Sequence, residues 1–156
     1  MNAIRLLRTQ HRRLEHLLAH VDDERATRLP RVLQLVEELM THLSIEDHLF
    51  LCRVADATGL RVDDYRDSQS RVRNAMLQAV FVEEDDPVFT ERLADLRTAF
   101  GDHSHTLERD LMPLVEARLA VGDLENLGDR MQTFWNATVG PEPGGTPQNA
   151  HFHAAE

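Results

Sequence analysis

Hydrophobic residues recur along most of this chain at steps of three and four, which is the spacing of the buried side of an α-helix. The pattern predicts four amphipathic helices, over residues 2–23, 29–55, 63–82 and 87–119, and a short fifth helix after residue 122. Turn signals separate them, because Asn2 and Asp86 are placed to cap helices and Thr58-Gly59 is placed to end one. We therefore expect an all-α fold, an antiparallel up-down four-helix bundle with a short fifth C-terminal helix packed across it.

The bundle is predicted to occupy residues 1–138 as one domain, which is long enough to bury a single core. Residues 139–156 contain many Pro and Gly residues and little that is apolar, so we expect a flexible C-terminal tail there.

Three of the four hydrophobic stripes contain histidine or glutamate where a core would hold leucine. In chain order these stripes are Ile4-Leu7-His11-Leu14-Leu18, Val32-Leu35-Leu39-His42-Glu46-Leu49 and Phe89-Leu93-Leu96-Phe100-His103-Leu107-Leu111-Leu114. Residues four apart in a helix share a face, so His42 and Glu46 point the same way. In an antiparallel bundle, His11, His42, Glu46 and His103 should meet at one level of the core. This layer is either a hydrogen-bonded polar core or a metal site.

A metal ion would satisfy all of these side chains together, whereas each buried polar group without a partner costs about 1–3 kcal/mol. Three imidazoles and a carboxylate suit Fe, Zn, Mn or Cu and do not suit Ca²⁺ or Mg²⁺, which prefer oxygen ligands. A further carboxylate from the fourth helix would balance the charge. We choose Glu108, which lies about one turn from His103, and keep as the alternative Asp110, which lies on the stripe but two turns away.

The stripe of the third helix carries Tyr65 and Gln69 one turn apart, near the same level as the other polar residues. These two side chains can hydrogen-bond each other or a water. The remaining polar candidates lie off the stripes and are expected to face solvent: His16, His20, Asp47, His48 and His105. Pro113 lies inside the fourth helix and predicts an irregularity over residues 109–113.

Charge and composition exclude several classes of function. A formal net charge of −10 disfavours binding to nucleic acids and anionic membranes, and all 17 cationic residues are arginine, so lysine chemistry is excluded. There is no phosphate-binding glycine loop and no Cys-x-x-Cys pair. The N-terminus lacks a signal-peptide core and the chain has one cysteine, Cys52, so we expect a cytoplasmic protein. Any chemistry must come from histidines and carboxylates.

The spaced set His11, His42-x-x-x-Glu46 and His103-x-x-x-x-Glu108 resembles the hemerythrin-like (HHE cation-binding) family, in particular its small stand-alone bacterial members. The resemblance covers about residues 1–138. It implies a four-helix bundle with a non-haem iron site, most often two iron ions with an oxo or hydroxo bridge. The third helix departs from the family pattern, because Tyr65-x-x-x-Gln69 stands where a pair of histidines is usual. By this resemblance, Tyr65 and Gln69 are weak or indirect partners of the metal, Tyr65 as a phenolate and Gln69 as an oxygen donor. This departure argues against reversible oxygen carriage and favours an altered di-iron site or a single-metal site holding Fe or Zn.

By this resemblance, the leading hypothesis is an iron protein that binds or reacts with a small oxidant, namely dioxygen, peroxide or nitric oxide, with catalase-like decomposition of peroxide as one version. The alternative is a bundle whose site has degenerated and which acts as a single-metal or metal-free interaction or sensor module. No nucleic-acid or membrane partner is expected.

Overall fold

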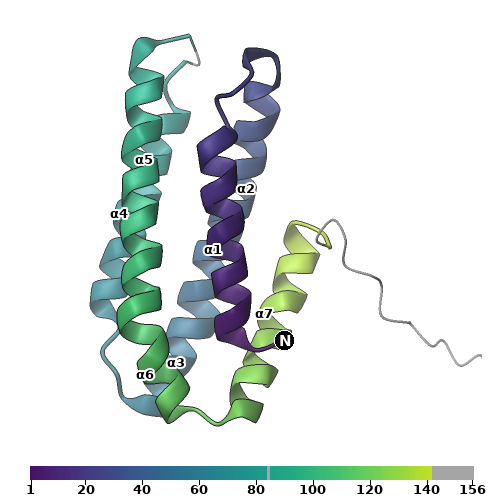
Figure 1. Ribbon diagram of the computed structural model, residues 1–156, viewed down its shortest axis with the longest axis vertical. Coiled ribbons are helices and arrows are strands. Elements are labelled where there is room, and N and C mark those ends of the chain that lie inside the picture. The colour runs from purple at the N-terminus through teal and green to yellow at the C-terminus, as the bar shows by residue number, and fades with distance from the viewer. Residues whose placement is uncertain (84, 142–156) are drawn as a thin grey trace, which may run out of the picture.

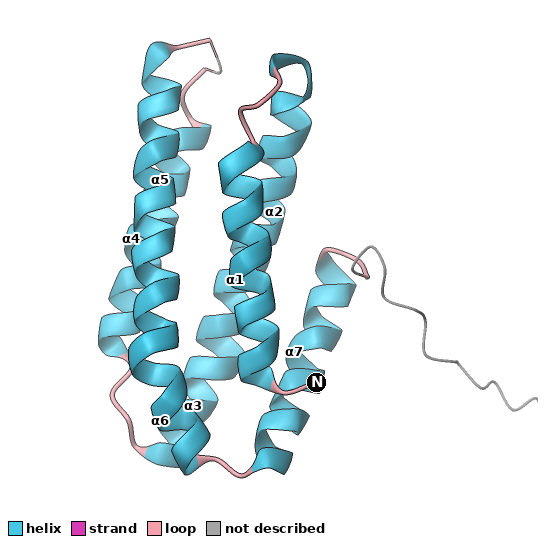
Figure 2. Ribbon diagram, viewed as in Figure 1, coloured by secondary structure: helices cyan, strands magenta, loops and turns pink. Residues whose placement is uncertain are grey.

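The computed structural model describes residues 1–83 and 85–141, and within these residues all regular structure is helical. The predicted all-α bundle is confirmed (Figures 1 and 2). The helices are α1 (Ala3–His20), α2 (Arg28–Ile45), α3 (Cys52–Thr58), α4 (Asp63–Val80), α5 (Pro87–Thr106), α6 (Met112–Arg118) and α7 (Val121–Thr138), with a 3-10 turn η1 (Arg25–Thr27) and two π-helical segments, η2 (Glu46–Leu51) and η3 (Leu107–Leu111). Most of the predicted tail, residues 142–156, lies outside the described residues.

Several helix ends follow the chemistry expected from the sequence. The Asn2 side chain accepts a hydrogen bond from the backbone N of Ile4 at 2.9 Å, and the Asp86 side chain accepts one from Val88 at 2.9 Å. Gly59 adopts φ 67°, a left-handed conformation that ends α3 and that side chains disfavour. These caps set the length of the bundle helices and hence the level at which the polar residues meet.

The second and fourth predicted helices each continue through a π-helical segment, which contains one extra residue per turn relative to an α-helix. The backbone N of Cys52 bonds to the carbonyl of Asp47, and the N of Met112 bonds to the carbonyl of Leu107, each five residues back. The second segment coincides with the irregularity predicted from Pro113, which cannot donate a backbone hydrogen bond.

These segments change which residues are buried beyond them. Leu114, predicted to face the core, is 44% exposed, whereas Met112 and Val115 are fully buried. In the same way, Leu49 is only partly buried, and the next residues, Phe50 and Leu51, are fully buried instead. The predicted stripe was therefore wrong at Leu114, because the wider turn rotates every later side chain.

The core consists of two apolar clusters with the polar layer between them. One cluster lies toward the connections of residues 21–27 and 81–86 and includes Leu14, Leu39 and Phe100. The other includes Leu7 and Phe50 and extends to α7. The clusters follow each other along α1 because Leu7 and Leu14 lie on either side of His11.

The fifth helix is longer than the sequence suggested, since α7 has 18 residues, and it lies beside the N-terminal half of α1 (Figure 1). Trp135 is its fully buried anchor in the second cluster. The N-terminal backbone crosses α7 at Gly128, where an added Cβ would lie 1.8 Å from the carbonyl oxygen of Met1. Over residues 1–83 and 85–141, no helix has both the length and the apolar character that crossing a membrane requires.

Candidate metal centre

Four ionisable side chains from α1, from the continuous helix α2–η2 and from α5 meet in the middle of the bundle. His11 comes from α1, His42 from the last turn of α2, Glu46 from the start of η2 and His103 from the last turn of α5. Each is at most 1% exposed, and one ligand atom from each lies within 4.8 Å of the others. The structure therefore brings together the four residues that the sequence placed in one layer.

The atoms that face one another in this cluster lack hydrogen-bond partners within the described chain. They are the Nε2 atoms of His11, His42 and His103 and the Oε2 atom of Glu46. Glu46 Oε2 lies 3.6 Å from Nε2 of His11 and 3.4 Å from Nε2 of His42, while Oε1 lies 3.0 Å from Nε2 of His103. Four buried polar atoms converge on one point, and such atoms are rarely left unsatisfied.

The other ring nitrogen of each histidine has a side-chain partner. Nδ1 of His11 lies 2.6 Å from Oε1 of Glu108, and Nδ1 of His42 lies 2.9 Å from Oε1 of Gln10. Nδ1 of His103 lies 2.5 Å from the hydroxyl of Ser68. A carboxylate or an amide oxygen only accepts, so the Nδ1 atoms of His11 and His42 carry the proton and each Nε2 lone pair faces the cluster. Hydrogen bonds of this kind orient the histidine ligands of metal sites.

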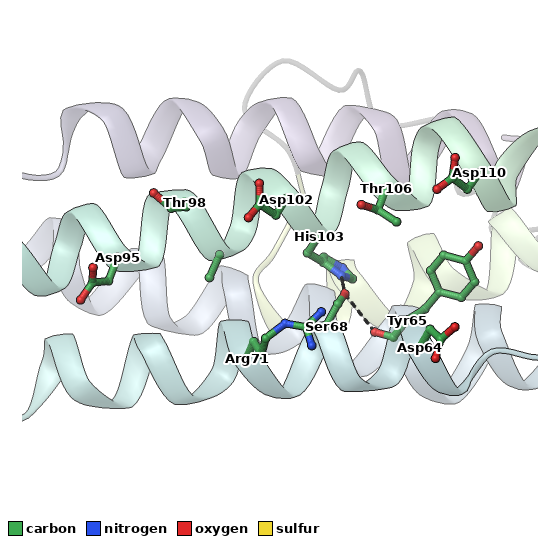
Figure 3. Close-up of a pocket in the computed structure, with 11 residues that line it drawn as sticks. Asp64, Tyr65, Ser68, Arg71, Asp95, Thr98, Asp102, His103, Thr106 and Asp110 are labelled. Carbon is green, nitrogen blue, oxygen red and sulfur yellow. Dashed lines mark hydrogen bonds between the residues drawn. The ribbon is translucent and has the colours of Figure 1, made fainter.

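The partner of His103 is held in the accepting role by its own helix. The Ser68 hydroxyl donates to the backbone carbonyl of Tyr65 at 3.1 Å, one turn earlier in α4. Its single proton is thereby used, so the Ser68 oxygen accepts a hydrogen bond from Nδ1–H of His103. Figure 3 shows this Tyr65–Ser68–His103 chain between α4 and α5.

Burial and neighbouring charges set the protonation of the cluster. Burial lowers the pKa of His42 to about 4, so this imidazole is neutral at neutral pH. Burial also acts to lower the pKa of His11, but the carboxylates of Glu108 and Glu46 outweigh it and leave that pKa raised. Burial acts to raise the pKa of Glu46, but the surrounding imidazoles hold it well below its usual value. An ionised carboxylate beside neutral His42 matches the state in which these groups bind metal.

The two candidate carboxylates from the fourth predicted helix lie outside the cluster. Glu108 reaches the far side of His11, at Nδ1, and its side chain is 31% exposed. Asp110 pairs with Arg109 at 2.6 and 2.7 Å and is 42% exposed. Glu108 therefore supports a candidate ligand from behind, and Asp110 does not touch the cluster.

Gln69 is buried beside the cluster, and its Nε2 donates to Oε1 of Glu46 at 2.6 Å. Tyr65 is only partly buried and lines an outer groove. The two are therefore not hydrogen-bonded to each other within the contacts described, and their roles differ. The polar residues predicted to face solvent, His16, His20, His48 and His105, are exposed, while Asp47 is 26% exposed and binds Arg66.

The groove lies between α4 and α5, has a volume of about 550 Å³, and reaches the cluster at His103 and Ser68 (Figure 3). Four aspartates line it with a single arginine, Arg71, so its walls carry an excess of negative charge. Its residues are Asp64, Tyr65, Ser68, Arg71, Asp95, Thr98, Ala99, Asp102, His103, Thr106 and Asp110. The phenol of Tyr65 stands at the Asp110 end of the groove.

The donor set fits a transition-metal ion. Three imidazole nitrogens and one carboxylate oxygen suit Fe, Zn, Mn or Cu, and the residues that would hold the ion are His11, His42, Glu46 and His103. A bound cation would supply a partner to all four unpartnered atoms at once.

Two of the supporting residues, Gln10 and Ser68, were not singled out from the sequence. Gln10 is fully buried although it precedes His11 and lies about 100° around the helix from it. Ser68 precedes Gln69 and is only partly buried. Neither residue interrupts a hydrophobic stripe, so periodicity gives no signal for them. The one feature of the sequence that marks both is that each directly precedes a polar residue of a stripe, His11 or Gln69.

Comparison with protein families gives one match. The family model described as "Hemerythrin HHE cation binding domain" matches residues 2–115 of this chain, a region that contains all four cluster residues and Glu108. No curated protein and no solved structure matches the chain.

Proposed function

Because the chain belongs to the hemerythrin HHE cation-binding domain family, we propose that it is a non-haem iron protein that binds or reacts with a small oxidant: dioxygen, peroxide or nitric oxide. The observation that carries this proposal is the set of four buried atoms, three imidazole Nε2 and one carboxylate Oε2, that face one another without partners. A polar core selected only for packing would place partners on these atoms.

Iron bound there would supply a Lewis-acidic, redox-active centre for a small molecule. The residues of the chain have separate tasks around it. On binding a cation, His11, His42 and His103 would offer it their Nε2 atoms, and Glu46 supplies the negative charge that a cation needs in a buried site. Phe100 covers the cluster, with its ring centroid 6.0, 6.1 and 6.4 Å from those of His11, His42 and His103. This apolar wall limits water on that side.

The polar groove at His103 and Ser68 supports approach between α4 and α5. Its excess of aspartates repels anions, so neutral molecules such as dioxygen, hydrogen peroxide and nitric oxide are the favoured ligands of the proposed centre. Catalase-like peroxide decomposition is one version of this function, and sensing of an oxidant is another.

A second candidate function is a degenerate site acting as a single-metal or metal-free interaction module. The observation that favours it is the hydrogen bond that the neutral amide of Gln69 donates to Oε1 of Glu46, at the edge of the cluster. In this case the bundle would use zinc for structure, or no metal at all.

Metal analysis and peroxide assays separate these functions. The purified protein is loaded anaerobically with Fe²⁺, freed of excess metal, and analysed for iron and zinc per chain; the oxygen evolved from hydrogen peroxide is then measured. We expect iron to be retained at close to stoichiometric amounts, and oxygen evolution if the catalase-like version holds.

The matched control is His42→Ala, which removes one donor. Retention well below one metal per chain in the unmutated protein would refute the proposed iron function, and a preference for zinc would favour the structural role.

A further inference from the structure

We propose that the buried cluster holds a single metal ion and that Gln69 is the residue that sets this number. The inference rests on the proposed metal-binding function and adds to it the stoichiometry and the residue responsible. It is supported by the hydrogen bonds that Glu46 and Glu108 accept and by the charge of the site.

The first step is the state of Glu46. Two neighbouring ions in a helical bundle are held together by carboxylates that give one oxygen to each ion. In this structure Oε2 of Glu46 is unpartnered and faces His11 and His42, but Oε1 accepts a hydrogen bond from Nε2 of Gln69 at 2.6 Å. Because a carboxylate only accepts, Gln69 must present its NH₂ group there. The oxygen that a second ion would need therefore already accepts a hydrogen bond, which such an ion would have to compete with.

The second step is the position of Glu108. This side chain is the other carboxylate within reach, but it lies on the outer side of His11, where Oε1 accepts from Nδ1 at 2.6 Å and Oε2 lies 4.0 Å from Nε of Arg8. Removing Glu108 from His11 to reach a second ion would leave the Nδ1 proton of a buried imidazole without its acceptor.

The third step is the charge of the site. Imidazoles that bind a metal ion are neutral, so the three histidines and Glu46 would carry −1 together. One divalent ion would bring these four groups to +1 and two would bring them to +3, and Glu108 on the outer side of His11 offsets only one of these charges. Uncompensated charge is costly in a buried environment, and the cost rises steeply with its magnitude. On α4, Gln69 adds no charge and Tyr65 stands in the outer groove, so neither offsets a second cation.

A change of one atom in the side chain tests the proposal. Gln69→Glu keeps the size of residue 69 but replaces the NH₂ donor by an oxygen, which frees Oε1 of Glu46 and adds a negative charge. Gln69→Leu is the matched control, since it also frees Oε1 but adds neither a ligand nor a charge. Each protein is titrated anaerobically with Co²⁺ and, separately, with Fe²⁺, desalted, and analysed for metal per chain; helical content is checked by circular dichroism.

We expect about one ion per chain in the unmutated protein and in Gln69→Leu, and a rise toward two in Gln69→Glu. After oxidation of the iron-loaded samples, the unmutated protein should give the electron paramagnetic resonance signal of isolated ferric iron, and Gln69→Glu should lose much of it because paired ferric ions are spin-coupled. If Gln69→Glu does not fold, Gln69→His, which offers a nitrogen ligand in place of the amide, is used with the same expectation.

Two ions per chain in the unmutated protein would overturn this inference while leaving the proposed metal function intact. A folded Gln69→Glu or Gln69→His that still binds one ion would also overturn it, because residue 69 would then not set the number. Near-zero metal in every protein, including the unmutated one, would instead overturn the proposed function itself.

Discussion

The two apolar halves of this bundle differ in how directly they follow from the sequence. On the side of the cluster toward the connections of residues 21–27 and 81–86, the helices are regular, and the buried residues are those that a period of 3.6 predicts, such as Leu14, Leu39 and Phe100. On the other side, η2 and η3 shift the pattern by about one residue, so that Phe50 and Met112 are buried. The candidate metal residues lie where one half meets the other.

This boundary has a physical consequence for the site. Both π-helical segments begin within four residues of a cluster histidine, η2 after His42 and η3 after His103. A π-helical turn is rare and poorly packed on its own, and such turns occur often at functional sites. Here the wider turn lets the polar residues face the cluster while the following apolar residues re-enter the core. The site and the core therefore require different helical phases on the same two helices.

The largest expected effect is the loss of metal binding when a cluster histidine is removed. His42→Ala should lower the affinity for Fe²⁺ or Co²⁺ by at least about 100-fold, because loss of a direct donor should exceed the 10–100-fold cost of losing a supporting residue. The measurement is a metal titration after removal of adventitious metal. His48→Ala is the control, because the His48 side chain is 74% exposed. The metal affinity of this variant should equal that of the unmutated protein. Equal losses in both variants would contradict the assignment of the cluster.

The register shift beyond η3 predicts a difference in stability between two nearby residues. Met112→Ala removes a fully buried side chain and should lower the free energy of unfolding by about 2–5 kcal/mol. Leu114→Ala removes a side chain that is 44% exposed and should lower it by only about 0.5 kcal/mol. Urea denaturation of the two metal-free variants measures both values. A larger loss for Leu114→Ala would mean that the regular helical phase continues through this segment.

The hydrogen bond behind His103 is expected to have the smallest of these effects. Ser68→Ala leaves Nδ1 of His103 without its acceptor and should weaken metal binding by about 10–100-fold. Ser70→Ala, on the same helix, removes only an exposed hydrogen bond to the carbonyl of Arg66 and serves as the control. The affinities are compared by competition with a chelator of known strength. An unchanged affinity in Ser68→Ala would show that the orientation of His103 does not depend on this contact.

Much of the fold and the centre of the site could be predicted from the chain alone. The helical period placed His11, His42, Glu46 and His103 on inward faces, because a residue in register with an apolar stripe lies on the same buried side of the helix. The caps at Asn2 and Asp86 were predictable because they depend on neighbouring backbone groups. The length of α7 and the burial of Trp135 were harder to predict, since they depend on packing against distant segments.

The sequence by itself determined the all-helical fold, the inward faces of the first half of each long helix and the four residues of the cluster, because these follow from local spacing. Tertiary structure alone decided the helical phase beyond Glu46 and Leu107, the side of His11 on which Glu108 lies, and the contacts of Gln10, Ser68 and Gln69. A hydrogen bond between side chains on different helices depends on how those helices are rotated and shifted relative to each other. One extra residue in a helical turn changes that rotation, and beyond it apolar residues occur at both helical phases, as Leu49 and Phe50 or Leu111 and Met112 do, so spacing alone does not choose between them.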